Sequence, residues 1–255
     1  LSAWGRVADY REYQLSQKAN LEIYRESALT PEHVLEFGFE HVCIATGSHW
    51  RRDGVSRQHI VPMQIDTGMP LFTPDDIMDG RFPTGHVVVF DDDHYYMGGV
   101  LAEALIQKGC SVTLVTPSAY VSDWTVNTLE QETIHRRLAE MGVDIQLNRG
   151  VEAIGAKAVT SNCTYTGATR ELACDAVLMV ASRQPDDALY EALRAQEDSW
   201  ADAGLKSVRL IGDANAPGPI AWATYAGHNY ARNLEEPDRG DALPFRREVA
   251  QLASG

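Results

Sequence analysis

Three consecutive aspartates and a histidine, Asp91 to His94, form a group of side chains that could do chemistry. Carboxylates and imidazoles bind metal ions, but consecutive residues point in different directions, and the acids of a calcium loop alternate with other residues. We therefore expect no metal site here. The surrounding stretch "HVVVFDDDHYYMGGVLAEALIQKGCSVTLVT" (residues 86–116) has the order strand, turn, helix and strand, which is typical of a nucleotide-binding unit.

The turn of this unit lacks the glycines that dinucleotide binding requires. Such a turn uses glycines so that its backbone N–H groups can reach the pyrophosphate. Asp91 and Asp93 occupy the first two of these positions, and the third holds Tyr96 or Gly98. Two like charges about 4 Å apart repel by roughly 4 kcal/mol at an effective dielectric constant of about 20, which corresponds to about a thousandfold in affinity.

The second strand of the unit departs from the pattern independently. It ends at Thr116, where an acid would accept the ribose hydroxyls of NAD, and no arginine stands there for the 2′-phosphate of NADP. The sequence therefore predicts that this unit does not bind NAD(P)H. We expect the carboxylates of residues 91–93 to cap the helix that begins near Tyr96, because they would satisfy its free N–H groups and its dipole.

Two further turns combine a strand end with glycine. "IATGS" leads a strand into Thr46 and Gly47, and "LIGDANAPGPIAWATYAGHNYA" leads a strand into Gly212 and Asp213, followed by a helix. Either turn alone is a weak signal, but the pair is more specific because a complete strand–helix–strand unit lies between them. Asp213 could contact a ligand or could act as the N-cap of the following helix.

Periodicity along the chain predicts an α/β protein. Alternating strands and helices favour right-handed crossovers around a parallel sheet, and the later strands suggest a small antiparallel addition. Thr30 and Pro31 mark the start of a short helix or turn, Gly109 ends the helix of the central unit, and residues 50–80 are mostly loop. The predicted helices are 7–19, 30–38, 98–108, 127–142 (with Leu129, Ile134, Leu138 and Met141 on one face) and 217–234; the predicted strands are 20–27, 39–48, 86–90, 111–116, a meander over 143–182, and 206–213, with a polar tail from 236.

Composition excludes several classes of function. The formal net charge of −14, from 22 basic and 36 acidic residues, argues against nucleic acid or an anionic membrane as a partner. The longest apolar runs are far shorter than the roughly 20 residues of a membrane span. The four cysteines include no CxxC pair, which predicts reduced thiols in a cytoplasmic protein and no metal site. The histidines have no nucleophile or paired carboxylate at motif spacing, so we expect no catalytic residues in this chain.

The order of the turns resembles the flavoproteins of the glutathione reductase type, which carry a pair of dinucleotide-binding-type domains. This resemblance implies a discontinuous ADP/FAD-type domain formed by residues 1–70 and 200–255, with an NAD(P)H-type domain, residues 72–195, inserted in it. "ASRQP" (181–185) partly matches the turn that leads out of such an insertion. The first strand–helix–strand unit of the outer domain, with its GxGxxG turn, is missing at the N-terminus. We therefore expect a piece of a larger protein; the alternative is a whole protein without that site.

The string "DDDHYYMGGVLAEALIQKGCSVTLVTPSAYVSDWTVNTLEQETIHRRL" closely resembles the C-terminal region of the trimethylamine, dimethylamine and histamine dehydrogenase family of iron–sulfur flavoproteins. The resemblance implies an upstream TIM barrel that carries FMN and a 4Fe-4S cluster, an ADP bound in place of FAD, and electron transfer to an electron-transfer flavoprotein. By the same resemblance, Thr46 and Gly47 flank the ADP ribose and pyrophosphate, and Gly212 and Asp213 lie at the distal end of that pocket.

The expected function is therefore that of a non-catalytic, ADP-binding and structural part of an amine dehydrogenase. The resemblance also implies that the complete protein is a homodimer. Two alternatives remain open. One is an NAD(P)H-dependent flavin reductase of the dienoyl-CoA reductase type, which would require the nicotinamide cofactor to bind at residues 86–116. The other is a stand-alone binding or scaffold module without an attached enzyme.

Overall fold

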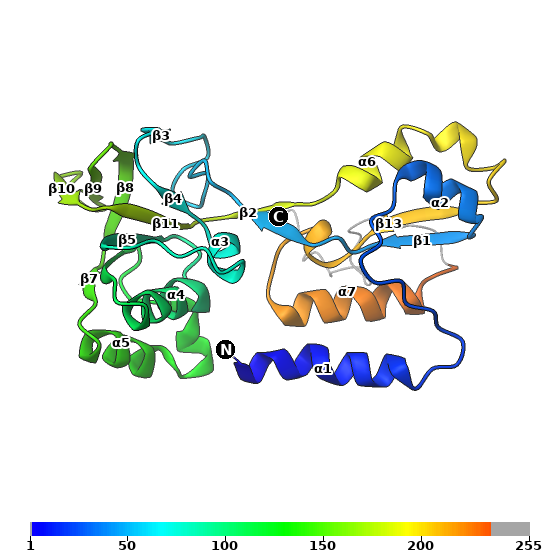
Figure 1. Ribbon diagram of the computed structural model, residues 1–255, viewed down its shortest axis with the longest axis horizontal. Coiled ribbons are helices and arrows are strands. Elements are labelled where there is room, and N and C mark those ends of the chain that lie inside the picture. The colour runs from blue at the N-terminus through cyan, green and yellow to red at the C-terminus, as the bar shows by residue number, and fades with distance from the viewer. Residues whose placement is uncertain (1, 236–255) are drawn as a thin grey trace, which may run out of the picture. The chain divides into compact units, whose positions relative to one another are not determined.

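The computed structural model describes residues 2–235, which form two compact units (Figure 1). Unit 1 contains residues 2–29 and 47–186, and unit 2 contains residues 30–46 and 187–235. These limits describe packing, and the predicted domain limits, 1–70 with 200–255 and 72–195, stay a prediction. The predicted tail from residue 236 lies outside the described residues.

A five-stranded parallel sheet forms the centre of unit 1. Its strand order is β4 (Leu71–Phe72), β11 (Ala176–Val180), β5 (His86–Asp91), β6 (Ser111–Val115) and β7 (Asp144–Gln146). The strands β5 and β11 are apolar almost throughout because both of their faces are covered, as is usual for parallel sheets. The predicted strands 86–90 and 111–116 are confirmed by β5 and β6.

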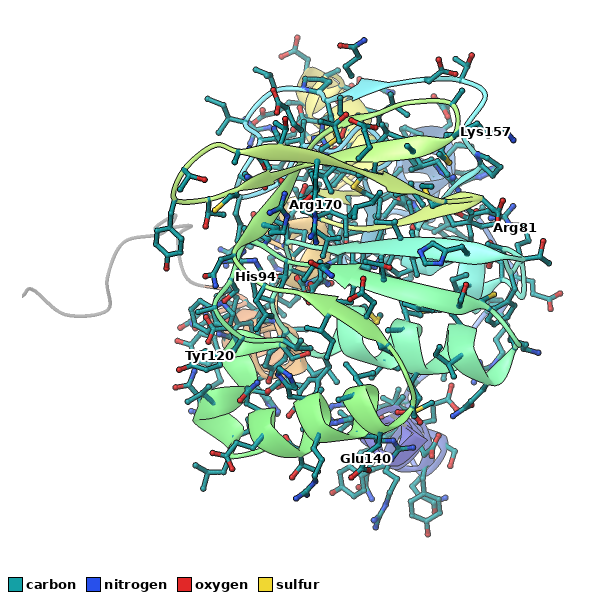
Figure 2. The ribbon with its side chains drawn as sticks, turned by 90° about the vertical axis from the view of Figure 1, so that its left-hand side faces the viewer. Arg81, His94, Tyr120, Glu140, Lys157 and Arg170 are labelled. Carbon is teal, nitrogen blue, oxygen red and sulfur yellow. The ribbon has the colours of Figure 1, made fainter. Side chains whose placement is uncertain are left out.

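The two faces of this sheet pack against different layers. Val87 and Val89 of β5 belong to one apolar core together with Leu105 of helix α4 (Tyr96–Gln107) and Leu138 of helix α5 (Gln131–Glu140). Phe90, which points the opposite way, belongs to a second core with the antiparallel sheet. Figure 2 shows the resulting order of helices, parallel sheet and antiparallel sheet, with Glu140 at the end of α5 and Lys157 and Arg170 beside the antiparallel strands.

The antiparallel addition was predicted as a meander. It consists of β8 (Arg149–Ile154), β9 (Ala158–Cys163) and β10 (Thr169–Ala173), and the short β3 (Gln64–Ile65) pairs in parallel with β8. The predicted stretch 169–182 divides between two sheets, because β10 ends at Ala173 and β11 joins the parallel sheet. The chain turns at Asp175, whose carboxylate accepts a hydrogen bond from the backbone N–H of His86 at 2.8 Å.

Unit 2 is built on two parallel strands, β1 (His41–Ile44) and β13 (Ser207–Leu210). Three helices accompany them, α2 (Pro31–Phe37), α6 (Ala188–Arg194) and α7 (Ile220–Arg232). Thr30 is the N-cap of α2 and Gly38 ends this helix in a left-handed conformation, so the predicted helix start is confirmed. The core of the unit consists of buried apolar side chains, namely Val34, Ile44, Leu193, Trp200, Leu205 and Val208.

Two predicted elements are wrong. Residues 20–27 do not form a strand, and the preceding helix α1 (Ser2–Ser16) begins earlier than predicted. Leu129 does not share the buried face of α5, since it is 91% exposed and has a φ of 62°. The cause is the short 3-10 helix η1 (Asp123–Thr128), which ends in this left-handed residue before α5 begins at Gln131.

Residues 50–80 contain more order than the predicted loop. The strand β2 (Ser48–Trp50), which pairs with β12 (Arg183–Pro185), ends at the start of this stretch, and β3, β4 and α3 (Pro74–Met78) lie within it. The remaining short elements are the 3-10 helices η2 (Glu197–Ser199) and η3 (Gly212–Ala214) in unit 2. No helix within residues 2–235 combines the length and the apolar character that crossing a membrane requires.

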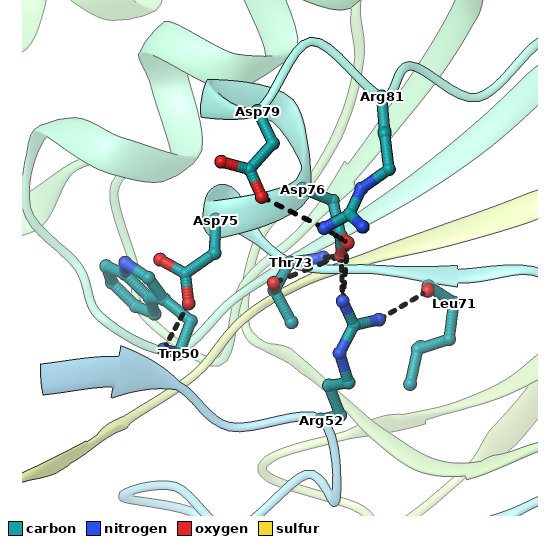
Figure 3. Close-up of polar contacts among 8 residues, drawn as sticks. All are labelled: Trp50, Arg52, Leu71, Thr73, Asp75, Asp76, Asp79 and Arg81. Atoms are coloured by element: carbon teal, nitrogen blue, oxygen red, sulfur yellow. Dashed lines mark hydrogen bonds and ion pairs between the residues drawn. The ribbon is translucent and has the colours of Figure 1, made fainter. Parts of the chain in front are cut away.

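A buried carboxylate fastens α3 to the loop before it (Figure 3). Asp76 is 4% exposed and accepts hydrogen bonds from Thr73 N at 2.8 Å and from Arg52 at 2.5 Å, and Arg81 lies 2.6 Å from the same group. Burial by itself favours the neutral acid, but the Thr73 N–H and the Arg52 guanidinium outweigh it and lower the pKa of Asp76. Arg52 also donates to Leu71 O at 3.0 Å, so this ion pair holds the loop against β4.

We expect Asp76→Asn to lower the free energy of unfolding by about 2 kcal/mol, because two arginines and a buried N–H lose a charged acceptor. Urea denaturation followed by tryptophan fluorescence measures the effect. Asp79→Asn is the matched control, since Asp79 pairs with Arg81 at 3.1 Å but is 67% exposed, and it should cost less than about 0.5 kcal/mol. Equal effects of the two substitutions would contradict the role given to Asp76.

Candidate functional site

The first of the three aspartates is buried at the end of β5. Asp91 has no exposed surface, and its Oδ1 accepts a hydrogen bond from His94 N at 3.0 Å. Its carboxylate lies directly against Gly98 of α4, where an added Cβ would be 2.4 Å from the Asp91 Cγ. Position 98 therefore requires glycine, because any side chain there would collide with the buried carboxylate of Asp91. Asp91 itself occupies the first glycine position of a dinucleotide-binding turn.

Asp92 is also buried, with 1% of its surface exposed, and it has partners different from those of Asp91. Asp92 accepts a hydrogen bond from Gln58 N at 2.8 Å, and its Oδ1 lies 3.1 Å from His94 Nε2. His94 connects the aspartates to α4 with a left-handed φ of 64°, and Figure 2 shows it beyond the end of the parallel sheet. Asp91 and Asp92 thus have separate hydrogen-bond partners.

The environments set different protonation behaviour for the three acids. Burial raises the pKa of Asp91 to about 7, although the N–H and the charge of His94 act in the opposite direction. Burial also opposes ionisation of Asp92, but hydrogen bonds from His94, Ser56 and Gln58 N prevail and lower its pKa. Burial raises the pKa of Asp93, with Arg183 and Arg57 as the main opposing charges. Negative charge at neutral pH is therefore favoured most strongly at Asp92.

The predicted helix cap is wrong. The N-cap of α4 is Tyr95, and no side chain forms the capping hydrogen bond. The reason is that β5 continues through Asp91, which carries this carboxylate beneath the helix, where it meets the N–H of His94 ahead of the first helical turn. The acid fills the space of the turn, but it does not satisfy the N–H groups of the helix.

At the end of β6, Thr116 stands where an NAD-binding unit would have an acidic residue. Thr116 is 1% exposed, and its Oγ1 accepts a hydrogen bond from Ser118 N at 3.3 Å. Its carbonyl accepts from Arg149 N at 3.0 Å. Thr116 therefore serves the local turn, at the position where an acid would bind ribose in an NAD site. Within residues 2–235, no group of three or more His, Cys, Asp or Glu side chains is arranged to hold a metal ion.

The two glycine turns predicted from the sequence begin at the same sheet edge. The strands β1 and β13 are parallel and in register, with Ile44 opposite Leu210, and Ile211 N donates to Ile44 O at 3.0 Å. The carboxyl ends of parallel strands meet at one edge, which is where α/β sheets bind ligands. Thr46 and Gly212 therefore follow neighbouring strand ends, although far apart in the sequence.

The glycines of both turns have backbone conformations that favour glycine. Gly47 has a φ of 86° and Gly212 a φ of 59°. An added Cβ on Gly212 would lie 3.7 Å from Ala223, so its conformation and not its space selects glycine. Asp213 Oδ1 accepts a hydrogen bond from Gly218 N at 3.1 Å, whereas the N-cap of α7 is Pro219. Thr46 is exposed.

Sequence reasoning missed the contacts made by residues 50–63. Gln58 N meets Asp92, and the Ser182 hydroxyl donates to Val55 O, so this segment adjoins the aspartate turn. No periodic pattern could have indicated these long-range polar contacts. The start of α3, however, could have been predicted from the sequence. Thr73-Pro74 followed by Asp76 has the form of a capping box with proline at the first helical position.

Comparison with known proteins is consistent with this geometry. Residues 72–161 match the family model described as the OYE-like second alpha/beta domain. Dimethylamine dehydrogenase of Hyphomicrobium sp. (strain x) is 30% identical over 276 residues, which cover 97% of this chain and 37% of that protein. The structure of histamine dehydrogenase from Rhizobium sp. 4-9 is 64% identical with a TM-score of 0.94, covering 100% of this chain and 40% of that one. The structure of 6-hydroxypseudooxynicotine amine oxidase from Pseudomonas geniculata N1 is 40% identical with a TM-score of 0.83, covering 90% and 34%.

The protein thus has a mixed α/β fold with parallel sheets, of the class to which the OYE-like second α/β domain belongs. The chain is homologous to dimethylamine dehydrogenase and histamine dehydrogenase, and the predicted resemblance is confirmed. It spans 37% and 40% of the lengths of these two relatives.

The raised pKa of Asp91 predicts a pH-dependent effect of Asp91→Asn. The contribution of a buried acid with a raised folded-state pKa is present below the unfolded pKa of about 4 and is lost as the pH rises through about 7. The Asp91→Asn variant cannot ionise at this position. As the pH rises from 5 to 8, the difference in unfolding free energy should therefore shift in favour of the variant, by on the order of 2–4 kcal/mol.

Urea denaturation of both proteins at the two pH values measures this difference. Asp79→Asn is the control, because Asp79 is 67% exposed and its substitution should show a pH-dependent difference below about 0.5 kcal/mol. A stability difference between the wild type and Asp91→Asn that stays constant from pH 5 to pH 8 would show that Asp91 is ionised throughout.

Proposed function

We propose that this chain is a non-catalytic, ADP-binding and structural part of an amine dehydrogenase that contains FMN and a 4Fe-4S cluster. Homology to dimethylamine and histamine dehydrogenases supports the enzyme class. The observation that carries the proposal is the turn between β5 and α4, where buried Asp91 packs against Gly98 in place of a glycine-rich turn. The unit keeps the strand–helix–strand form, but its turn is unsuited to the phosphates of NAD(P)H.

The ends of the β1 and β13 strands fit one end of a nucleotide site. Two turns with left-handed glycines, Gly47 and Gly212, follow these neighbouring parallel strands, and exposed Thr46 and the Asp213 carboxylate stand beside them. In this proposal, Thr46 and Gly47 flank the ribose and pyrophosphate of ADP, and Gly212 and Asp213 lie at the distal end of the pocket. We further propose that both domains are of the dinucleotide-binding type found in flavoproteins such as glutathione reductase.

The residues present do not fit the iron–sulfur cluster. Within residues 2–235, no group of three or more possible ligands is arranged for a metal, and Cys110 and Cys174 are each buried in separate apolar surroundings. Bound FMN would accept electrons from the amine in the complete enzyme. We assign FMN and the cluster to an upstream TIM barrel, and we assign no step of the reaction to the residues of this chain.

The proposed partners are those expected of an amine dehydrogenase of this kind. They are the upstream barrel of the same protein, a second copy in a homodimer, and an electron-transfer flavoprotein that receives the electrons in the cytoplasm. The net charge of −14 supports the exclusion of nucleic acid and anionic membranes as partners.

The full-length protein should be reduced by an amine and not by a nicotinamide cofactor. Stopped-flow mixing with dimethylamine, histamine or 6-hydroxypseudooxynicotine should bleach the flavin absorbance with at least one of them, whereas 1 mM NADH or NADPH should leave it unchanged over minutes. Rapid bleaching by NADH together with no response to amines would instead favour a reductase of the dienoyl-CoA reductase type.

The same protein should carry ADP. Acid denaturation followed by chromatography should release close to one ADP per chain, and Gly212→Ala should lower this content at least severalfold, because its Cβ disturbs the turn after β13. Gly204→Ala is the matched control: Gly204 has a similar φ of 74° and open space around it, and it precedes the amino end of β13, whereas the candidate site is at the carboxyl end. Both variants should lose about 1 kcal/mol of stability, but only the first should lose nucleotide. Equal ADP contents would remove Gly212 from the site.

A further inference from the structure

A loop of unit 1 is bonded to the residues that follow β5 and β11. This loop, residues 53–63, is called the strap. Its base is closed by a hydrogen bond from Met63 N to Asp53 O at 2.8 Å, and Asp53 is held by Arg51 at 2.5 Å. Near its tip, Ser56 N donates to His59 O at 2.7 Å. The strap is therefore a compact, internally bonded segment.

The strap is attached on both sides of the point where a ligand is expected. In the sheet order β4-β11-β5-β6-β7, chain order reverses between β5 and β11, and ligands bind outside the carboxyl ends of the strands at such a switch point. Asp92 follows β5 and accepts Gln58 N at 2.8 Å. Ser182 follows β11, and its hydroxyl donates to Val55 O. The strap thus bridges the two strand ends that define the switch point.

Three further contacts hold the strap in place. His59 Nε2 lies 2.6 Å from Val151 O of β8. The Gln58 side chain lies against Gly150, where an added Cβ would be 2.0 Å from its Nε2. The Arg57 guanidinium stacks 5.7 Å from the ring centre of Trp124 in η1. These contacts reach the antiparallel sheet on one side and the segment before α5 on the other.

The polarity of the turn is reversed relative to a phosphate site. A dinucleotide turn donates N–H groups to phosphate oxygens. Here the turn supplies the acceptor, the Asp92 carboxylate, and the strap supplies the donor, the N–H of Gln58. A phosphate in this place would meet a carboxylate and would have to displace a donor that the carboxylate already binds.

We propose that the strap is a built-in occupant of the dinucleotide site of unit 1, so that the site is closed by a segment of the chain as well as by charge. This inference goes beyond the proposed function, because it concerns how the site is closed and holds for any substrate of the complete enzyme. It adds occupation by the strap to the repulsion by the aspartates that the sequence predicted.

The attachment of the strap is tested by hydrogen–deuterium exchange on the full-length protein. The peptide covering residues 54–62 should be protected, and Asp92→Ala should speed its exchange at least tenfold, because Gln58 N loses its acceptor. Asp75→Ala is the matched control: Asp75 accepts Trp50 N at 2.8 Å in the same part of unit 1, and its loss should leave residues 54–62 unchanged. Unprotected exchange in the wild type, or no response to Asp92→Ala, would overturn the proposal.

Occupation is tested by removing charge and strap separately. The triple variant Asp91→Asn, Asp92→Asn and Asp93→Asn removes the charge, while the side-chain amide carbonyl introduced at position 92 can still accept Gln58 N. The second variant carries the same substitutions and has three glycines in place of residues 54–62, a linker that spans the ends because Met63 N and Asp53 O are bonded. Equilibrium dialysis with up to 1 mM NADH should detect binding at least fivefold higher in the second variant.

Substantial NADH binding to the triple variant with its strap intact would show that charge alone closes the site, and equal lack of binding by a folded strap-shortened variant would show that the strap excludes nothing. If shortening prevents folding, the exchange experiment decides. Failure of this inference is distinguishable from failure of the proposed function, because the latter is decided by reduction of the wild-type flavin by amine or by NADH.

Discussion

The burial of the Asp91 carboxylate at the end of β5 is the constraint on which the rest of the aspartate turn depends. A carboxylate without exposed surface needs space and at least one donor. Gly98 provides the space in α4, and His94, in a left-handed conformation, brings its N–H to Oδ1. The same conformation places the His94 ring beside Asp92, which accepts a hydrogen bond from the strap. One buried acid therefore determines the course of four residues.

The parallel sheet of unit 1 has the strand–helix–strand form of a nucleotide-binding unit, but the turns at its carboxyl edge differ from the dinucleotide pattern. Its apolar strands, α4 and α5 form the same core that a dinucleotide-binding unit would require. The departures from that pattern described above lie at the carboxyl edge, at Asp91 and Thr116 and in the strap. Since the stability of the unit comes from the layers and the binding from the edge, the edge can change without loss of the fold.

Sequence reasoning located the elements whose signals are local. The strands β5 and β6 and helix α4 were predicted from the spacing of their apolar residues, and the start of α2 was predicted from its cap residue Thr30. Each of these signals lies within a few positions of the sequence. Leu129 was misplaced because the η1 turn before α5 leaves no periodic trace. The hydrogen bond between Gln58 and Asp92 joins residues 34 positions apart. Its donor is a backbone N–H, which every residue except proline offers. Nothing in the identity of residue 58 could have predicted it.

The candidate site at the ends of β1 and β13 depends on strand register in a way that residue types do not reveal. Thr46 and Gly212 each follow a strand by two residues, and the ends of these strands are neighbours because Ile44 pairs with Leu210. Parallel strands cannot be joined by a tight hairpin, so a long connection between β1 and β13 is unavoidable. Here the chain leaves through β2 and returns through β12, which pair antiparallel with Ser48 opposite Pro185. Asp186 N then bonds to Gly47 O at 3.0 Å, so the chain is tied together at the turn itself. A substitution in this ribbon would therefore disturb the glycine turn after β1 without touching any residue of the β1–β13 pair.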